Sequence, residues 1–428
     1  VMTGRIPAGS RPVALGKSLR MQQVALHYGR GELVLAIPDE YAITAFAPRP
    51  ADEPVTYERF RAEFIGRGGL AAIRGEPVVV VNDGFRRTPT ALVLEWLDRI
   101  DSGLLDRASF LAATGTHGTP SEEDWGKIFG RFRERVRART AVHDCRDAGS
   151  MTRLGEDPLG GEVYVNRAVL GTRPVVVIGS VEPHYFAGYT GGRKGIFPGM
   201  VDLATTERNH NLARAMAAAP LRLAGNPVAE HLQALMDRID GARFFSIQAV
   251  LDAAQRVAGV FCGGMTESFQ RATVLADQIY AFRGAGPFGT VLAELRPPLD
   301  RNLYQLQKAV ENCQAAVADG GALVVVSACA EGMGSPHFAD LATRWDPGGN
   351  APRDGGPATF GSHKLSRVVA IARRIAVRVH TEMKDDEVRR VFYEPLDNVA
   401  NFLYLRRDAC ENNNLAVVYD AGHTVLTA

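Results

Sequence analysis

The chain has 428 residues, 46% of them hydrophobic and 23% charged, and a formal net charge of +1. This length exceeds what one compact core usually holds, so we expect two domains. The balanced charge leaves no surplus of cations for a nucleic-acid backbone, and no apolar run approaches the roughly 20 residues that span a bilayer. Neither nucleic acid nor a membrane is therefore an expected partner.

The amino-terminal stretch VMTGRIPAGSRPVALGKSLRMQQ lacks the apolar centre and the cleavage site of a secretory signal, and we interpret it as a frayed or tag-like end. The five cysteines lie far apart in the sequence, at Cys145, Cys262, Cys313, Cys329 and Cys410. They form no CxxC pair, so neither a zinc ribbon nor a disulfide framework is indicated. We expect buried, inert thiols in a cytoplasmic protein.

Strand-like and helix-like stretches alternate along the chain. Apolar runs typical of strands buried on both faces lie at 77–83, 173–180, 242–251, 256–264, 321–328 and 374–380. Helical periodicity is found at 89–100, 125–140, 204–219 and 265–282. The alternation predicts two α/β domains with largely parallel sheets and an active-site cleft between them.

The composition also suggests where the domains begin and end. We predict an amino-terminal α/β domain over 20–265, a connecting helix over 266–279 and a carboxyl-terminal α/β domain over 280–400. The glycine-rich stretch 346–363 has no periodic pattern and is expected to be a long surface loop, mobile or closing over a ligand. The end of the chain, NLAVVYDAGHTVLTA, is typical of two short strands, and we expect this tail (about 411–428) to return to the amino-terminal domain.

The stretch GAGPFG at 284–289 matches the GxGxxG fingerprint of dinucleotide-binding proteins. A helix precedes it, an apolar TVLAEL run follows it and Pro287 lies inside it. The fingerprint requires a preceding strand and a following helix, so we interpret this match as an interdomain turn.

Polar candidates lie at the end of one predicted strand and in a glycine-flanked loop. Asp83 and Arg86 lie in VVVVNDGFRRTPT, where a strand ends and where ligands collect in α/β sheets. A capped helix with a local ion pair would give the same pattern. His117 lies in the glycine-flanked AATGTHGTPSEEDWGKIF, before a helix with Ser121 and Asp124 in a capping arrangement. A surface position and a functional site are equally compatible with this histidine.

The stretch HYFAGYTGGRKGIFPG at 184–199 combines His184 and Lys194 with five glycines in sixteen positions. The glycines would let backbone N–H groups approach an anion such as phosphate, and the lysine would supply a charge or a nucleophilic amine. A flexible loop with a solvated lysine is the alternative.

Two helices carry further polar candidates. His210 is flanked by asparagines, an unusually polar setting for a core position. In DRNLYQLQKAVENC at 300–313, Tyr304 and Lys308 share a helix face and Gln305 lies beside them. A structural histidine and a solvated helix face are the ordinary interpretations of these patterns.

Taken together, these stretches resemble the nickel-dependent lactate racemase family, whose members racemise or epimerise 2-hydroxyacids. The resemblance runs from about residue 28, in YGRGELVLAIPDE, to the carboxyl end. It depends on the order of five motifs: Asp-x-x-Arg, TGTH, PHYFAGYTGGRKGIFPG, ERNH and LYQLQK. No single motif would carry it.

The resemblance implies a small-molecule 2-hydroxyacid substrate and a nickel-pincer nucleotide, a Ni(II) pyridinium-3,5-bisthiocarboxylic acid mononucleotide. Lys194 matches the lysine that holds this cofactor through a thioamide, with binding by charge alone as the alternative. His210 matches the histidine that coordinates nickel, and His117 and His184 match two catalytic histidines. The remaining residues that the resemblance assigns to cofactor binding are Thr190, Gly191 and Gly192. Those assigned to the substrate pocket are Asp83, Arg86, Tyr304, Gln305 and Lys308.

The residue types suit this chemistry. A Cα–H beside a carboxylate is barely acidic, whereas its removal as hydride gives a planar 2-ketoacid that can be reduced on either face. Two histidines on opposite sides suit transfer of the hydroxyl proton, and Arg or Lys would anchor the carboxylate. Sulfur donors with one imidazole suit square-planar Ni(II), and because the cofactor brings the sulfurs, the chain needs no cysteine cluster.

Three departures from the family pattern leave the substrate open. Arg86 and Arg87 are adjacent where one arginine followed by proline is expected, so they could exchange roles. Gly118 replaces a bulkier residue after the histidine and would enlarge the pocket. The family's late aromatic residue has no clear match in VHTEMKDDEVRRVFYEP. Larger or dicarboxylic 2-hydroxyacids therefore stand beside lactate as candidates.

Two other functions stay open on sequence grounds. A zinc-dependent hydrolase would use His117, His184 and His210 as metal ligands, although an HExxH motif is absent. A non-catalytic hydroxyacid- or nucleotide-binding protein would have the same cleft without turnover.

Overall fold

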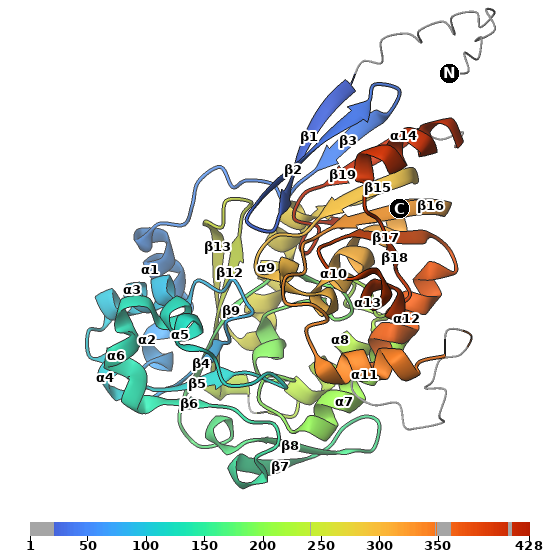
Figure 1. Cartoon of the computed structure of the whole chain (residues 1–428). Coiled ribbons are helices and arrows are strands. Elements are labelled where there is room, and N and C mark those ends of the chain that lie inside the picture. Colours follow the sequence, from blue (N-terminus) through green and yellow to red (C-terminus); the bar gives the residue numbers. More distant parts are fainter. Residues whose placement is uncertain (1–20, 240, 347, 349–360, 410–412) are drawn as a thin grey trace, which may run out of the picture.

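The computed structural model describes residues 21–428 except 240, 347, 349–360 and 410–412. Figure 1 shows two sheets in separate halves of the molecule, with the long helix α9 (Met265–Tyr280) near its centre. The other helices are α1 Tyr57–Gly66, α2 Gly69–Ala72, α3 Thr90–Ile100, α4 Leu104–Arg107, α5 Glu122–Phe129, α6 Arg133–Val136, α7 Leu203–Asn211, α8 Pro227–Met236, α10 Leu303–Cys313, α11 Pro336–Arg344, α12 Ser362–Ala372, α13 Asp385–Arg390 and α14 Val399–Ala409.

The first sheet has six strands in the order β13-β12-β9-β4-β5-β6. Their bounds are β4 Val78–Asn82, β5 Ser109–Ala113, β6 Thr140–Val142, β9 Val175–Ser180, β12 Phe244–Leu251 and β13 Val257–Gly263. All neighbours pair in parallel except β12 and β13, which are antiparallel. Small antiparallel pairs lie outside the sheet: β7 (Met151–Glu156) with β8 (Glu162–Asn166), and β10 (Pro183–His184) with β11 (Gly188–Tyr189).

Both faces of the first sheet are buried, which explains why its strands read as continuous apolar runs. Val79 and Val81 of β4 belong to a core cluster with α1 and α3, whereas Val78 and Val80 belong to another with α8 and β8. Successive strand residues point to opposite faces, so such a strand needs a covering layer on each side.

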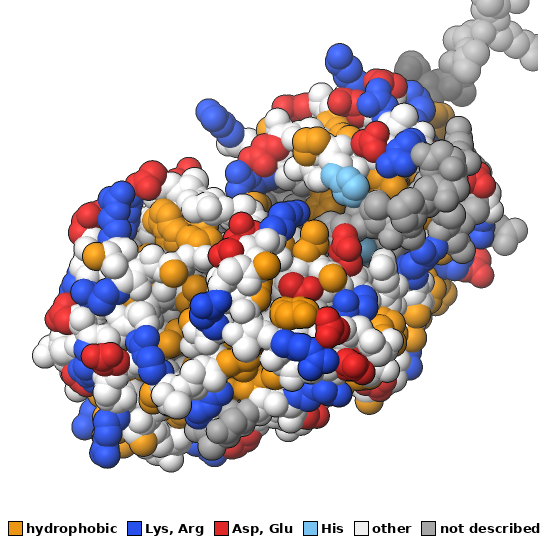
Figure 2. All heavy atoms as spheres, turned by 90° about the horizontal axis from the view of Figure 1, so that it is seen from below, with side chains coloured by type: hydrophobic (Ala, Val, Ile, Leu, Met, Phe, Trp, Pro, Cys, Tyr) orange, Lys and Arg blue, Asp and Glu red, His pale blue; other side chains and the backbone are white. Residues whose placement is uncertain are grey.

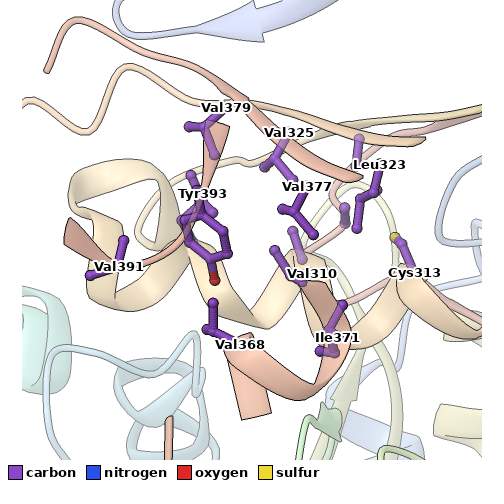
Figure 3. Packing of buried hydrophobic residues seen from close by; sticks show 14 of the residues in the cluster. Val310, Cys313, Leu323, Val325, Val368, Ile371, Val377, Val379, Val391 and Tyr393 are labelled. Carbon is purple, nitrogen blue, oxygen red and sulfur yellow. The ribbon is translucent and has the colours of Figure 1, made fainter. Parts of the chain in front are cut away.

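The second sheet has the order β18-β17-β16-β15-β19-β3 and is parallel throughout. Its strands are β3 Ala42–Phe46, β15 Phe288–Glu294, β16 Val317–Val326, β17 Ala376–His380, β18 Glu394–Pro395 and β19 Asn414–Val418. Figure 3 shows one face, where Val325 and Val377 pack on Val310 of α10 and Val368 of α12. The hairpin of β1 (Met21–Tyr28) and β2 (Gly31–Pro38), together with α14, covers the other face.

The predicted α/β class with largely parallel sheets is confirmed, and so are most predicted elements. The six apolar runs correspond to β4, β9, β12, β13, β16 and β17. The stretch 125–140 is not one helix, because Gly130 ends α5 with a φ of +53° that a continuing helix does not allow. The helix predicted at 204–219 ends at Asn211 and continues as a short 3-10 turn.

Other sequence interpretations have mixed outcomes. GAGPFG forms the turn between β14 (Ala281–Phe282) and β15, as expected for a chance match. Most of the predicted loop 346–363 lies outside the described residues, but its last two residues, Ser362 and His363, begin α12. The four described cysteines are free and buried, and Cys410 lies outside the described residues.

The carboxyl-terminal tail pairs with amino-terminal residues, but it does so in the second sheet, because β3 lies in that sheet and not in the first. Its strand β19 lies between β15 and β3 in the second sheet, and β20 (Val425–Leu426) pairs with β14. Leu415 and Val417 are fully buried in the cluster that β1, β2 and α14 cover. This burial places the tail and the amino-terminal residues 21–46 together on the second sheet.

An ion pair buried between the halves ties them together. Arg367 of α12 donates two hydrogen bonds of 2.6 Å to Glu311 of α10, and both side chains are almost fully buried. Arg367 also donates to the carbonyls of Ala213 and Ala215, just beyond α7 of the other half. Removing one partner of such a pair leaves an uncompensated buried charge, so the contact fixes how the halves meet.

None of the helices in the described part of the chain is long and apolar enough to cross a membrane. In the view from below, Figure 2 shows Lys and Arg side chains interspersed with Asp and Glu over the described surface.

Candidate active site

A cavity of about 370 Å³ lies between the two halves of the molecule. Residues that follow β4, β5 and β9, together with α7, line one side, and residues of α10, α11 and α12 line the other. This volume is typical of small-molecule sites. The predicted cleft between two α/β units is thus confirmed.

Strand order explains why distant sequence motifs meet here. The parallel strands β9, β4 and β5 are neighbours in the first sheet. Their carboxyl ends therefore lie at one edge, and the loops that follow them carry His184, Asp83 and His117 respectively. Each of these three residues lines the cavity.

His117 is oriented by Asp83. Its Nδ1 lies 2.6 Å from Asp83 Oδ2, and its ring lies 4.7 Å from the ring of Phe85. A carboxylate at Nδ1 holds the proton on that nitrogen, which leaves the Nε2 lone pair for proton transfer. The His117 side chain is 40% exposed. Gly118, expected to enlarge the pocket, is exposed and is not among the lining residues.

The structure separates the roles of the two adjacent arginines. Arg86 lines the cavity, with its Nη1 3.9 Å from Glu182 Oε1. Arg87 points elsewhere: its guanidinium donates at 2.8 Å to Asp420 and also to the carbonyl of Pro297. Arg86 is therefore the arginine available to a ligand in this cavity.

His184 is buried at the end of the β10–β11 hairpin. The Ala187 backbone N–H donates to its Nδ1 at 3.3 Å, and the Phe186 ring packs edge-on at 4.5 Å. Burial lowers the pKa of this imidazole well below its usual value, and the nearby cations Lys194 and Arg86 lower it further. A neutral imidazole at neutral pH is suited to accept a proton.

Lys194 projects into the cavity from the glycine-rich turn. Burial lowers the pKa of its amine well below the usual value, and Arg86 and Arg193 add to this effect. A lower pKa increases the fraction of the amine that is unprotonated and nucleophilic, which suits covalent attachment of a ligand. The Lys194 Nζ lies 5.7 Å from the centre of the Phe186 ring.

The glycines around Lys194 allow the chain to form this tight turn, rather than mainly presenting backbone N–H groups to a ligand. Gly191 (φ +73°) lines the cavity, and a Cβ there would lie 2.6 Å from the Ser180 carbonyl oxygen. Gly192 is not among the lining residues, because it packs against Phe269 and its N–H donates to Gln248 Oε1 at 2.8 Å.

Thr190 lines the cavity and also fixes the hairpin before Lys194. Its Oγ1 donates to the Ser180 carbonyl at 3.0 Å and accepts the Glu182 backbone N–H at 3.0 Å. The turn that carries Lys194 is therefore held rigidly against the end of β9.

His210 lies on α7, with Nδ1 2.9 Å from the Thr206 carbonyl of the preceding helical turn. A carbonyl can only accept, so Nδ1 carries the proton and the lone pair is on Nε2, the arrangement found in histidines that bind metals. Burial lowers the pKa of His210 to about 3, with Lys194 contributing. The Phe186 ring lies 5.0 Å away.

Helix α10 brings Tyr304, Gln305 and Lys308 to the cavity from the second half, as their spacing predicted. Burial lowers the pKa of Lys308 well below its usual value, and Arg86 and Lys364 add to this effect. The helix begins at Asn302, whose side chain accepts the Gln305 backbone N–H.

Sequence reasoning missed Lys364 and Phe338, which also line the cavity. Lys364 is buried, donates to the Tyr304 carbonyl at 3.1 Å and lies 3.9 Å from the centre of the Tyr304 ring. Burial lowers its pKa to about 7. Phe338 packs edge-on against Tyr304. This aromatic lining residue lies outside VHTEMKDDEVRRVFYEP, the stretch in which the family's late aromatic residue was expected.

A compositional signal could have revealed Lys364. Only six of the 49 Lys and Arg residues are lysines, and three of these six line one cavity: Lys194, Lys308 and Lys364. In a chain that otherwise uses arginine, a lysine marks a place where an amine is required.

The donor set fits a metal group that brings most of its own ligands. Among the described residues, no group of three His, Cys, Asp or Glu side chains is placed to hold a metal ion. His210 instead offers one oriented imidazole beside an amine. The cations around the cavity match an anionic ligand such as a nucleotide phosphate or a carboxylate.

Comparison with known proteins agrees with these features. The lactate racemase amino-terminal domain family matches residues 28–220, and the lactate racemase carboxyl-terminal domain family matches residues 293–347. The lactate racemase of Thermoanaerobacterium thermosaccharolyticum is 24% identical over 437 residues, covering 95% of this chain and 99% of the relative. That of Lactiplantibacillus plantarum is 26% identical over 335 residues, covering 74% and 77%.

Solved structures show the same fold. The lactate racemase apoprotein of Thermoanaerobacterium thermosaccharolyticum superposes with a TM-score of 0.83 at 22% identity, covering 95% of this chain and all of the other. A crystal structure of a Thermotoga maritima protein gives 0.66 at 17% identity, covering 88% and 99%. The matching family domains together span more than half of the sequence, and this chain belongs to the lactate racemase family.

Proposed function

We propose that this chain racemises or epimerises 2-hydroxyacids, with lactate the first candidate, and that it works with a nickel-pincer nucleotide. One observation carries the proposal: His117 and His184 border the same cavity as Lys194 and His210. Such a reaction requires from the protein two proton-transfer groups, an amine and a single oriented imidazole.

Cationic and polar groups on both sides of the cavity bind the substrate. Arg86 and Lys308 anchor the carboxylate by charge-assisted hydrogen bonds, and the same charges stabilise a developing carbonyl oxygen. Tyr304 and Gln305 position the rest of the substrate. Because these residues lie on different halves, substrate binds where the halves meet.

His117 and His184 handle the hydroxyl proton from opposite enantiomers. His117 works through Nε2, because Asp83 holds its Nδ1. His184 starts neutral because of burial and the surrounding cations. Each histidine takes the proton in one direction of the reaction and returns it in the other.

The cofactor is held by Lys194 and His210, with Thr190 and Gly191 forming the adjoining wall. When bound, it supplies the acceptor and donor of the Cα hydride. Gly192 supports the turn from behind. The comparison structure described as an apoprotein is compatible with a family that carries a separate cofactor.

The alternative functions have less support. A zinc hydrolase that uses His117, His184 and His210 needs a cluster of three ligands, and the described residues contain none. A binding protein without turnover would not require a carboxylate-oriented histidine opposite a buried neutral one.

The function is tested with cofactor-loaded protein and a panel of single-enantiomer 2-hydroxyacids, read by chiral chromatography. We expect conversion of at least one acid, L-lactate first, to its other enantiomer. His117→Gln and His184→Gln should each lower the rate about a hundredfold or more, since each removes one proton-transfer group, while nickel content stays unchanged. No conversion by loaded wild-type protein, or wild-type rates in either variant, would contradict the proposal.

Replacing Lys194 tests the assignment of the cofactor site. Lys194→Ala should lose bound nickel and the near-ultraviolet and visible absorbance of the cofactor, because the amine that holds it is gone. Lys194→Arg keeps a positive charge but cannot form a thioamide, so it should lose the cofactor if attachment is covalent. Exposed Lys384→Ala is the control. Nickel and absorbance unchanged in Lys194→Ala would disprove the assignment.

The neighbouring arginines make a matched pair for substrate binding. Arg86→Gln should reduce kcat/KM by about tenfold to a hundredfold, the usual cost of a lost hydrogen bond to a charged group. Arg87→Gln should change kcat/KM little and instead lower the melting temperature, because Asp420 loses its partner. The reverse pattern would show that Arg87 is the arginine that binds substrate.

A further inference from the structure

We propose that His184 exchanges its catalytic proton with solvent through a small second cavity behind the ring, bordered by Glu182 and His423. The inference rests on the proposed function, because a reaction with two bases loads a proton onto one histidine at every turnover. Glu182 and His423 then serve as relay residues that act through His184 without touching substrate.

The need for such a route follows from the proton balance. When one enantiomer is converted, its hydroxyl proton moves to the first histidine and the second histidine protonates the new hydroxyl. The substrate gains and loses one proton, but the protein ends with a proton on the wrong imidazole. Before the next turnover, one histidine must release a proton and the other must take one up.

The two histidines differ in their access to solvent. The His117 side chain is 40% exposed, so water can exchange its proton directly. His184 is buried, and a bound ligand would cover the face that borders the main cavity. A slow return of the proton from His184 would therefore limit the rate unless a second route exists.

A second cavity, of about 10 Å³, lies against His184. Its polar lining consists of Arg86, Glu182, His184, Lys308 and His423. This volume holds about one water molecule, and polar groups surround it, as ordered internal water requires. His184 borders both cavities, as do Arg86, Tyr185 and Lys308, so the small polar space lies directly beside the main cavity.

From the small cavity the path continues to the surface. His423 Nδ1 lies 3.0 Å from Asp420 Oδ1, and Arg87 donates to Asp420 Oδ2 at 2.8 Å. Burial raises the pKa of Asp420, but His423 and Arg87 hold it below its usual value, so at rest Asp420 is a carboxylate and His423 Nδ1 carries a proton. When His423 takes a proton at Nε2, its Nδ1 proton passes to Asp420, which releases it to solvent and becomes a carboxylate again. Asp420 also borders a surface groove with Arg296 and Tyr419.

Charges around the route favour outward movement of the proton. Lys194, Arg86 and Lys308 lower the proton affinity of His184, and burial has the same effect. Glu182, whose Oε1 lies 3.9 Å from Arg86 Nη1, is an acidic group on the small cavity and stabilises positive charge there. Lys194 borders only the main cavity and repels a proton on His184 from that side, whereas Arg86 and Lys308 border both cavities. Glu182 is therefore the group that attracts the proton to the relay side.

The test separates proton return from the chemical steps. Glu182→Gln and His423→Ala are loaded with cofactor and assayed in both directions with L-lactate and D-lactate, or with the best pair from the panel. We expect kcat to fall by about tenfold or more while kcat/KM stays near the wild-type value, because the return step limits turnover only at saturating substrate. Added imidazole should restore kcat in His423→Ala.

Controls exclude a general structural effect. Asp252→Asn removes another buried carboxylate that borders neither cavity and should leave kcat unchanged. Glu182→Asp, which keeps the acid, should retain most of the wild-type kcat. If both relay variants keep the wild-type kcat, or if kcat and kcat/KM fall equally, the relay is disproved even though the wild-type protein racemises its substrate. An inactive wild-type protein would instead refute the proposed function.

Discussion

Burial of positive charge beside two imidazoles is the constraint on which this site depends. Arg86, Lys194, Lys308 and Lys364 border one cavity, and burial lowers the pKa of all three lysines. Keeping cations out of water costs free energy that only anionic partners recover. The cavity is therefore built for negatively charged ligands, and the same field keeps His184 neutral.

The geometry that creates this field arises where the two sheets meet. One edge of the first sheet supplies Asp83, His117 and His184, and α10 and α12 supply the amines and the tyrosine opposite them. The buried Arg367–Glu311 pair joins these helices to the segment that directly follows α7. His210 lies on α7 itself. A shift of either half would move the groups proposed to bind substrate away from those proposed to bind the cofactor.

Local patterns made much of this architecture predictable. Apolar runs identified strands buried on both faces and placed Asp83 and His184 after strand ends, where the structure has them. The strand before His117, β5, was not predicted. The order of the strands is not written in any local pattern. The sequence therefore did not reveal that residues 42–46, which we expected in the first domain, form β3 of the second sheet and pair there with β19.

Site residues were predictable where a sequence motif marked them, but not where long-range packing determines which side chain reaches the cavity. Eleven of the twelve predicted site residues line the cavity, and Gly192 is displaced because Gln248 takes its N–H. The choice between Arg86 and Arg87 depended on Asp420, more than 300 residues away in the chain. Lys364 was not predicted as a site residue, because no motif surrounds it and its only distinguishing feature is that it is a lysine in a chain rich in arginine.

In the proposed reaction, the Cα hydrogen moves as hydride and returns to carbon, while the histidines move only the hydroxyl proton. The most direct measurement uses L-lactate deuterated at C2, incubated in ordinary water with cofactor-loaded protein, followed by mass spectrometry of the D-lactate formed. The account predicts that the product keeps its deuterium at C2. Replacement of that deuterium by solvent hydrogen would show that the carbon is deprotonated and would contradict the account.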